Sequence, residues 1–167
     1  NTRVGQGTQF KVYLPAAVEA GEVRAPSSVE DLPRGKGELV MVVDDEESIR
    51  GVAQRALEEN GFRVVTAEDG ADAMLVFSRS KEPITAVLTD MIMPVMDGAA
   101  LIRALTRYSP EVRLVAFSGM AEQEQEAIQA GLAQGAFLLK PLSLDRLIRM
   151  VHRVLHGHVG IAETSPQ

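Results

Sequence analysis

From residue 38 to residue 157, apolar and polar positions follow two alternating patterns. Short continuous apolar runs, which are typical of strands buried on both faces, alternate with longer segments that carry apolar residues every three or four positions, as amphipathic helices do. The predicted strands cover 39–43, 62–66, 84–89, 112–117 and 136–139. The predicted helices cover 48–59, 70–77, 98–108, 121–130 and 142–155.

Five strands that alternate with five helices predict an α/β fold with a parallel sheet covered on both faces. With right-handed crossovers, the natural topology is a flavodoxin-like, doubly wound, five-stranded sheet in the order 2-1-3-4-5. Its switch point lies between the first and third strands. The C-terminal ends of those two strands carry Asp44, Asp45 and Asp90, so ligands are expected there.

The residues outside this repeating pattern differ in composition and in hydrophobic pattern. The last part of residues 1–16, from Gln9 to Leu14, alternates apolar and polar residues, which predicts a half-buried strand. Residues 17–37 combine Pro, Gly and Ser with charges, which is typical of a linker. Residues 158–167 are interpreted as a tail. The predicted domain therefore covers residues 38–157.

Composition narrows the classes of function. The 167-residue chain has a net charge of −6 and no basic cluster, which argues against general nucleic-acid binding. It has no Cys, so disulfides and thiolate metal sites are excluded. No apolar run approaches a membrane span, and the N-terminus lacks the layout of a signal peptide. We expect a cytoplasmic segment without nucleic-acid or membrane contacts, although a parent protein could be membrane-anchored.

Three carboxylates are predicted to meet at the switch point: Asp44, Asp45 and Asp90. Because like charges repel, a cation is expected among them. An all-oxygen ligand set with room for water and a phosphate suits Mg²⁺ better than Ca²⁺. A carboxylate can attack a phosphoryl group to give an aspartyl phosphate, so we interpret Asp90 as a phosphate acceptor.

The fourth and fifth predicted strands end in further candidate groups. Ser118 follows Phe117 and places a hydroxyl at the same edge of the sheet, and Lys140 follows Leu139 and places an ammonium there. A lysine acts on phosphate as a compact positive charge. Together with the carboxylates, these two groups form a constellation that can stabilise charge on a transferred phosphoryl group.

Several of these residues also fit simpler structural roles. Asp44 or Asp45 could cap the first helix, but metal binding is favoured because the other candidates converge on the same edge. Asp97 is expected to cap the third helix rather than bind metal. The methionines after the third strand are expected to fill gaps in the core: Met91, Met93 and Met96. The histidines near the C-terminus are expected to be solvated rather than to hold a metal: His152, His156 and His158.

Residues 38–157 resemble a receiver domain of response regulators. The residues that carry the resemblance are Val43-Asp44-Asp45-Glu46, Leu88-Thr89-Asp90 with Met93-Pro94 and Asp97-Gly98, Phe117-Ser118-Gly119, and Gly135-Ala136-Phe137-Leu138-Leu139-Lys140-Pro141. The match covers the whole predicted domain in the right order. It implies membership of a two-component signalling system.

The resemblance implies a role for each matching residue. Asp90 accepts a phosphoryl group from a phosphohistidine, while Ser118 and Lys140 contact the phosphoryl oxygens. Phe137 matches the aromatic residue that moves with Ser118 on activation, and the Lys140–Pro141 peptide is expected to be cis. The Mg²⁺ ligands that the resemblance implies are Asp44, Asp45, Asp90 and the backbone carbonyl of Ile92.

The N-terminal residues resemble a second family. Gly5-x-Gly7-Thr8-x-Phe10-x-Val12-Tyr13-Leu14-Pro15 is similar to the end of a histidine-kinase ATP-binding domain. The two resemblances imply the C-terminal part of a hybrid sensor histidine kinase, with residues 1–16 as a stub. The phosphorylated-His helix is absent here, so this segment is not expected to be a kinase by itself. The implied partners are histidine-kinase phosphotransfer helices or a histidine phosphotransfer protein, which would dock near Ile49 and Ala53.

Two other functions are compatible with part of this pattern. An Mg²⁺-dependent phosphatase with an aspartyl nucleophile needs a second Asp two residues after the first, where this chain has Ile92. A degenerate binding domain would never become phosphorylated. For the receiver, Ile92 and Met120, two residues after Asp90 and Ser118, are hypothesised to slow self-dephosphorylation by excluding water.

Overall fold

The computed structural model describes residues 2–3, 7–8 and 32–157, which belong to two separate units. In the first unit, β1 (Thr2–Arg3) pairs with β2 (Gly7–Thr8) in an antiparallel, two-stranded sheet. The strand predicted within residues 9–14, the linker up to residue 31 and the tail from residue 158 lie outside the described residues.

The second unit contains a five-stranded sheet whose neighbouring strands are all parallel. Its strands are β3 (Leu39–Val43), β4 (Arg63–Ala67), β5 (Ile84–Asp90), β6 (Arg113–Ser118) and β7 (Phe137–Leu139). They are arranged in the order β4-β3-β5-β6-β7, which is 2-1-3-4-5 within this sheet. The predicted α/β class and the flavodoxin-like strand order are confirmed.

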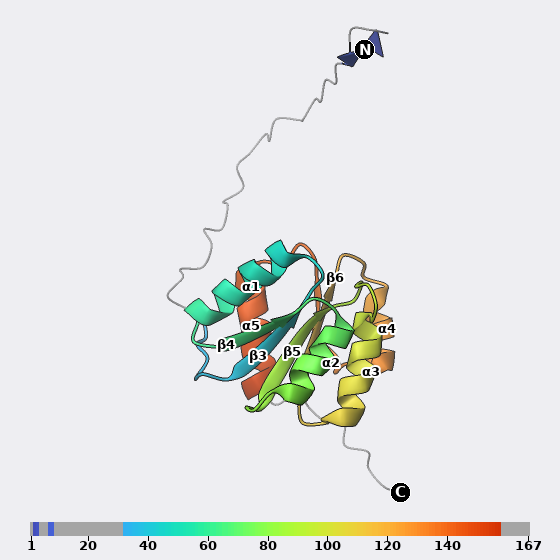
Figure 1. The fold of residues 1–167 in the computed structure, drawn as a ribbon. Coiled ribbons are helices and arrows are strands. Elements are labelled where there is room, and N and C mark those ends of the chain that lie inside the picture. The colour runs from blue at the N-terminus through green and yellow to red at the C-terminus, as the bar shows by residue number, and fades with distance from the viewer. Residues whose placement is uncertain (1, 4–6, 9–31, 158–167) are drawn as a thin grey trace, which may run out of the picture. The chain divides into compact units, whose positions relative to one another are not determined.

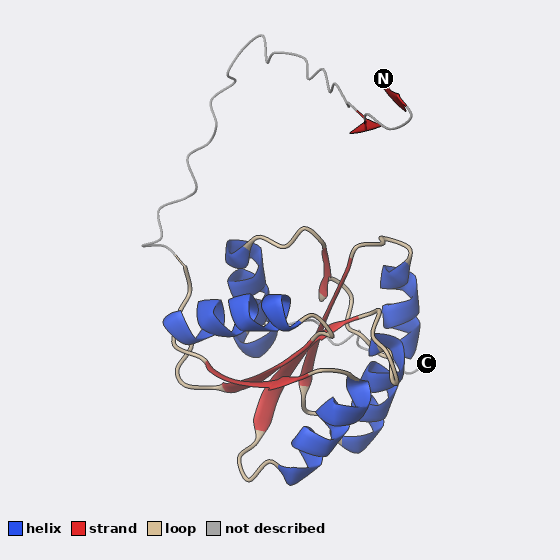
Figure 2. Ribbon diagram, turned by 45° about the horizontal axis from the view of Figure 1, so that its top comes forward, coloured by secondary structure: helices blue, strands red, loops and turns tan. Residues whose placement is uncertain are grey.

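Four helices connect the strands and a fifth follows the last strand, and together they cover both faces of the sheet (Figures 1 and 2). They are α1 (Glu47–Glu59), α2 (Gly70–Arg79), α3 (Gly98–Tyr108), α4 (Gln123–Ala130) and α5 (Leu144–His156). Figure 1 shows α1 and α5 on one side of the sheet and α2, α3 and α4 on the other, and the contacts between helices agree: α1 touches α5, and α3 touches both α2 and α4.

The central strand β3 shows how the sheet is buried on both faces. Its five residues are all buried, and side chains alternate between the two faces with a period of two. Val40 and Val42 belong to a cluster that includes residues of α1 and α5, whereas Met41 and Val43 belong to a second cluster that includes residues of α2 and α3. This two-sided burial explains why the strand is uniformly apolar in sequence.

Capping side chains and a glycine determine where the helices α3 and α5 begin. The Asp97 carboxylate accepts a hydrogen bond of 2.7 Å from the Ala100 N–H and caps α3, which confirms the capping role predicted for it. The last helix begins at residue 144 rather than 142 because Ser143 is its cap. A Cβ at Gly98 would lie 2.2 Å from the Asp90 carbonyl oxygen, so only glycine lets α3 begin so close to the end of β5.

The apolar residues of α1 are buried unevenly. Ala53, Ala56 and Leu57 are buried, but Ile49 is only partly buried and Val52 is 56% exposed. The reason is geometric: these two residues line a groove between α1 and the start of α5 instead of packing on the sheet.

Residues 32–37 have the composition of a linker, and the structure groups them with the sheet domain. The Gly35 N–H donates to the Asn60 carbonyl over 2.8 Å, and the Gly37 N–H donates to the Gly61 carbonyl over 2.9 Å. The segment thus lies against the turn between α1 and β4. The predicted boundaries of the other segments stay predictions. Among the described residues, no helix has the length and hydrophobicity needed to cross a membrane.

Candidate functional site

Strand register brings the predicted site residues to one edge of the sheet. Val43 of β3 pairs with Thr89 of β5, so the following residues, Asp44 and Asp90, are neighbours across the two strands. In the same way, Asp90 pairs with Phe117 just before Ser118, and Ser118 pairs with Leu139 just before Lys140. The parallel arrangement therefore aligns four functional groups that are up to 96 positions apart in sequence.

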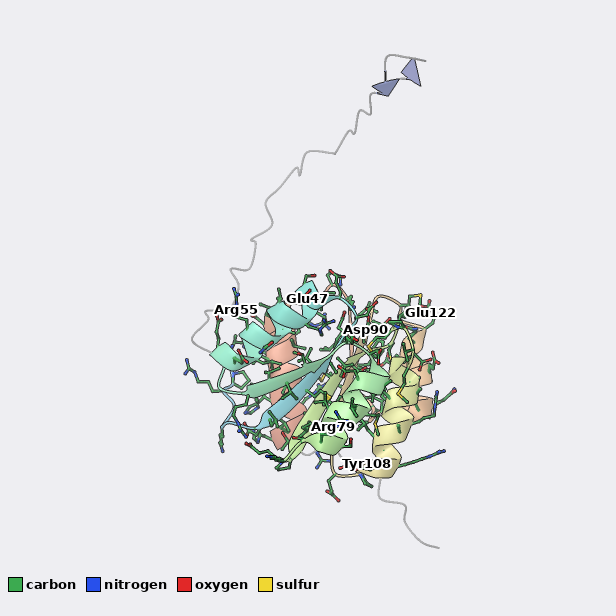
Figure 3. The ribbon with its side chains drawn as sticks, in the orientation of Figure 1. Glu47, Arg55, Arg79, Asp90, Tyr108 and Glu122 are labelled. Atoms are coloured by element: carbon green, nitrogen blue, oxygen red, sulfur yellow. The ribbon has the colours of Figure 1, made fainter. Side chains whose placement is uncertain are left out.

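Figure 3 shows where this edge lies in the domain. Asp90 lies at the same end as Glu47 and Glu122, which stand at the starts of α1 and α4. Arg79 and Tyr108, at the ends of α2 and α3, lie at the opposite end. The candidate site is thus at the C-terminal edge of the strands, where open α/β sheets bind ligands.

The Lys140 ammonium bridges two buried carboxylates. Its Nζ lies 3.0 Å from Asp90 Oδ2 and 3.2 Å from Asp44 Oδ2, and it sits 5.2 Å from the centre of the Phe117 ring. Asp44 and Asp90 are both buried, so this amine is the local counter-charge for two acids. The Lys140–Pro141 peptide is cis, as the resemblance implied.

Backbone amides hold the second oxygen of each of these carboxylates. Asp90 Oδ1 accepts a 2.8 Å hydrogen bond from the Met91 N–H, and Asp44 Oδ1 accepts one of 2.8 Å from the Glu46 N–H. The helix cap itself is Glu46, whose side chain makes no capping bond. Asp44 therefore orders the turn before α1, and its other oxygen stays directed at the Lys140 amine.

Asp44, Asp45 and Asp90 form the cluster that could hold a metal ion. One carboxylate oxygen from each lies within 4.8 Å of the others. Asp45 is exposed, so it leaves the cluster open to water on one side. Hard oxygen donors with an open side suit a small divalent cation that keeps several waters, and Mg²⁺ fits this description.

The two described C-terminal histidines contact each other, and one of them also contacts a carboxylate. The rings of His152 and His156 lie 4.5 Å apart between centroids, and His156 Nε2 lies 3.1 Å from Glu38 Oε1. Within residues 32–157 the three aspartates are the one group of at least three acidic or imidazole side chains close enough for an ion. His158 lies outside the described residues. His156 is therefore paired with a carboxylate rather than only solvated.

Burial and charge shift two pKa values at the site. Burial raises the pKa of Asp90, the Lys140 ammonium opposes this shift, and the Asp44 charge reinforces it, so the pKa lies above its ordinary value. Burial alone would lower the pKa of Lys140, but its hydrogen bond to Asp90 and the charges of Asp90 and Asp44 outweigh this and raise it. A raised pKa makes the ionised Asp90 carboxylate a stronger nucleophile.

The Ser118 hydroxyl turns toward α4. The side chain is fully buried, its O–H donates to Gln123 Oε1, and its oxygen accepts a 3.1 Å bond from the Met120 N–H. Gln123 is the first residue of α4 and had no predicted role. A glutamine in the polar first turn of a helix gives no sequence signal that its side chain reaches back to the preceding strand. Phe137, the predicted switch partner of Ser118, is half-buried.

Two apolar side chains that follow site residues in sequence are exposed. Ile92 is 52% exposed and Met120 is 47% exposed, and their role in excluding water stays a prediction. Met91 and Met93 are buried in the core, which confirms their predicted packing role. Val95, in the loop after β5, has a φ of 61°, which is uncommon for a β-branched residue, and its side chain is almost fully exposed. The sequence gives no signal for this conformation.

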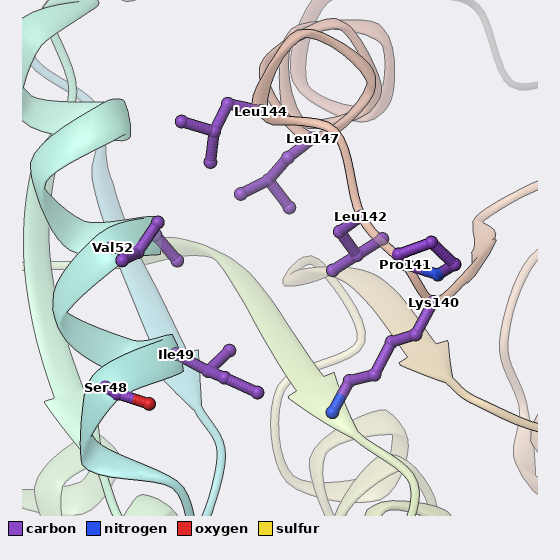
Figure 4. Close-up of a pocket in the computed structure, with 9 residues that line it drawn as sticks. Ser48, Ile49, Val52, Lys140, Pro141, Leu142, Leu144 and Leu147 are labelled. Carbon is purple, nitrogen blue, oxygen red and sulfur yellow. The ribbon is translucent and has the colours of Figure 1, made fainter. Parts of the chain in front are cut away.

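A mostly apolar groove of about 310 Å³ adjoins the cluster. Figure 4 shows Ile49 and Val52 of α1 on one side and Leu144 and Leu147 of α5 on the other, with the Lys140 side chain at one end. The groove therefore connects an exposed apolar surface directly to the amine that contacts Asp90.

Comparison with known proteins identifies the family. The model of the response regulator receiver domain matches residues 40–152. The chain belongs to the response regulator receiver domain family. This receiver is 31% identical over 120 residues to the chemotaxis protein CheY of Bacillus subtilis, a match that covers 70% of this chain and 97% of CheY. The structure of the chemotaxis response regulator CheY4 of Vibrio cholerae has a TM-score of 0.65 and 28% identity, and the match covers 71% of this chain and 99% of that one.

A longer relative matches beyond the receiver. The chain is 32% identical over 164 residues to the sensor kinase CckA of Brucella abortus, a match that covers 93% of this chain and 17% of the kinase. This alignment extends into residues 1–31, because residues 32–167 are only about four fifths of the chain. The chain thus spans about a sixth of that relative's length.

Proposed function

We propose that this receiver accepts a phosphoryl group on Asp90 from a phosphohistidine, with Mg²⁺ bound by the aspartate cluster. The observation that carries the proposal is the Lys140 ammonium, which lies 3.0 Å from Asp90 Oδ2 and 3.2 Å from Asp44 Oδ2 at an edge open to water. A positive charge beside a buried carboxylate of raised pKa suits attack on an anionic phosphoryl group.

The transfer conserves atoms and electrons without a further reactant. An oxygen of the Asp90 carboxylate forms a bond to phosphorus while the bond between phosphorus and the histidine nitrogen breaks, and the electron pair returns to that nitrogen. Lys140 binds one phosphoryl oxygen, and the Ser118 hydroxyl binds another. Mg²⁺, held by Asp44, Asp45, Asp90 and the Ile92 carbonyl, would neutralise charge on the phosphoryl oxygens.

The groove between α1 and α5 suits a donor protein that presents its phosphohistidine on a helix. Its walls are mainly apolar, and its inner end is Lys140, so a partner helix seated in it would place a side chain next to the cluster. Receiver domains interact with histidine kinases or phosphotransfer proteins. We propose that this groove docks the phosphotransfer helices of a histidine kinase or a histidine phosphotransfer protein.

The N-terminal residues support a larger context. The resemblance of residues 5–15 to the end of a kinase ATP-binding domain agrees with a match to a sensor kinase that continues before residue 32. We therefore propose that this receiver is part of a hybrid sensor histidine kinase that acts in the cytoplasm. The kinase activity would reside in other parts of that protein.

Two observations weigh against the rival functions. A phosphatase with an aspartyl nucleophile needs an acid two residues after it, and that position is the apolar Ile92. A degenerate domain needs no amine aligned with two buried acids, and such a cluster is costly to bury without a function. The receiver function therefore fits the residues best.

Incubation with acetyl phosphate and Mg²⁺ tests the proposal. Intact-mass measurement should show one phosphoryl adduct on the parent chain and none on Asp90→Asn. Beryllofluoride with Mg²⁺ should shift the NMR resonances of residues next to Asp90, a suitable probe because the chain contains no Trp for fluorescence. Removal of Mg²⁺ with a chelator should abolish both signals. A folded parent chain that took up neither reagent would contradict the proposal.

A further inference from the structure

Ser118 has a single proton to donate, and in this structure Gln123 receives it. The buried hydroxyl donates to Gln123 Oε1 and accepts from the Met120 N–H, which fills its donor and one acceptor position. Asp90, in contrast, takes its side-chain hydrogen bonds from Met91 and Lys140. In the absence of a phosphoryl group, the hydroxyl is therefore bound to α4 rather than to the aspartate cluster.

A phosphoryl group on Asp90 would compete for the same proton. Phosphoryl oxygens at neutral pH are acceptors, so a contact with Ser118 needs the hydroxyl proton that Gln123 now accepts. The step from one state to the other breaks the Ser118–Gln123 bond. This argument rests on the proposed function, because it needs Asp90 to be the phosphoryl site.

The first turn of α4 has backbone hydrogen bonds from Gln123 to Met120 and from Glu124 to Ala121, but its side chains are weakly anchored. The helix has only eight residues and buries two side chains, Ala127 and Ala130. Its cap residue, Glu122, makes no side-chain capping bond. Between Ser118 and the helix lies Gly119, around which a Cβ would meet no atom within 4 Å. The Ser118–Gln123 hydrogen bond is therefore a side-chain link, here called the tie, between the end of β6 and the start of α4.

We propose that Gln123 is a positioning residue that holds Ser118 away from the phosphoryl site and releases α4 when Asp90 is modified. The Ser118–Gln123 hydrogen bond opposes phosphoryl binding, and phosphoryl binding opposes this hydrogen bond, because both need the Ser118 hydroxyl proton. The two sites are therefore coupled reciprocally, as linkage requires. The position of the first turn of α4 becomes the output of the modification.

Replacement of Gln123 tests this coupling in the full 167-residue chain. Gln123→Met keeps the side-chain length without an acceptor, so the apparent affinity for beryllofluoride at fixed Mg²⁺ should rise about two- to tenfold, the effect of one lost hydrogen bond. Gln123→Glu offers a charged acceptor, which binds the hydroxyl more strongly, so the affinity should fall. The affinities are measured by NMR titration, and hydrogen exchange in the first turn of α4 should be faster in Gln123→Met.

Two controls separate the tie from a general effect. Gln125→Met changes an exposed glutamine of the same helix and should leave the affinity unchanged. In a Ser118→Ala background, Gln123→Met and Gln123→Glu should no longer differ, because the shared proton is gone. The opposite directions of the two Gln123 variants would not arise from simple loss of stability.

The outcomes distinguish this inference from the function on which it rests. If the parent chain binds beryllofluoride and both Gln123 variants bind it with the parent affinity, the tie is wrong while the phosphoacceptor role stands. If the parent chain, folded and with Mg²⁺, binds no beryllofluoride, both proposals fail. Equal shifts of both variants in one direction would also overturn the tie.

Discussion

The candidate site at the C-terminal edge of the sheet has two halves, whose side chains are held by different kinds of interaction. In the acidic half, formed by Asp44, Asp90 and Lys140 at the ends of β3, β5 and β7, two ion pairs link side chains from three strands. In the hydroxyl half, formed by Ser118 and Gln123, one neutral hydrogen bond links a strand to the helix that follows it. Charged contacts of this kind are roughly twice as strong as neutral ones.

The helices that follow the two halves also differ in how firmly their side chains are buried. The 13-residue α5 follows Lys140 and buries five large side chains, Leu147, Ile148, Met150, Val151 and Val154. The eight-residue α4 follows Ser118 and buries only two alanines. The groups proposed for chemistry are therefore anchored by a deep core, while the group proposed for switching is attached to a helix with a small buried face.

Loss of a buried side chain should destabilise the domain more in α5 than in α4. Leu147→Ala removes a buried side chain of α5 and should lower the free energy of unfolding by about 2–5 kcal/mol. Ala127→Gly, at the buried face of α4, should lower it by only about 1 kcal/mol. Urea denaturation followed by circular dichroism measures both values. Equal losses at the two positions would mean that α4 is anchored as firmly as α5.

The next effect concerns the groove beside the acidic half. Val52→Asp puts a charge on its exposed wall, so phosphoryl transfer from a phosphorylated histidine kinase should slow about 10- to 100-fold, the loss of one central interface contact. Uptake from acetyl phosphate should stay near the parent rate, because a small donor does not use the groove.

Leu75→Asp is the matched control for that variant. Leu75 lies on α2, away from the groove, and has a similar exposure of 45%. Transfer from the kinase should be unchanged in this variant. If Leu75→Asp and Val52→Asp slowed transfer equally, the groove would not be the docking site.

The parts of this molecule that depend on periodic burial could be predicted from the sequence. Mainly apolar runs predicted all five strands of the sheet, since strands covered on both faces are rich in apolar residues. Strand ends then placed Asp44, Asp90, Ser118 and Lys140 at one edge, because parallel strands align their C-terminal ends. The position of each of these groups follows from register alone.

The remaining features depend on contacts that no local pattern encodes. Val52 follows the apolar spacing of α1 but faces the groove, because the path of α5 leaves it uncovered. Residues 32–37 have linker composition, yet their backbone binds the turn at Asn60 and Gly61, and backbone bonds are independent of side-chain type. Gln123 shares a bond with Ser118 that only the three-dimensional turn between β6 and α4 creates.

A smaller effect is expected on the pH dependence of stability, which reports the ionisation of Asp90 in the acidic half. The pKa of Asp90 is raised, so the folded state binds this proton more tightly than the unfolded chain does. Without metal, stability should therefore decline as pH rises from the ordinary pKa of 3.8 through the raised pKa, and the whole penalty is present above it. Asp90→Asn removes the penalty and should raise the free energy of unfolding at neutral pH by about 0.5–2 kcal/mol.

Denaturation at several pH values in the presence of a chelator measures this difference. The gap between Asp90→Asn and the parent should narrow toward pH 3 and widen toward neutral pH. Asp45→Asn, a change in the exposed carboxylate of the same cluster, should follow the parent profile more closely. A gap that stayed constant over the whole range would show that ionisation of Asp90 is not its source.

The smallest effect tests the water-exclusion hypothesis for Ile92. Ile92 is 52% exposed and lies two residues after Asp90, and the hypothesis is that it limits the space for an attacking water. Ile92→Asn should speed loss of the phosphoryl group about three- to tenfold, because the amide can hold that water with one hydrogen bond. Val95→Asn, in the same loop but almost fully exposed, should change the lifetime less. The lifetime is measured by intact mass after removal of acetyl phosphate. If both variants decayed at the parent rate, water access would have to be controlled from the hydroxyl half, where Met120 is the corresponding side chain.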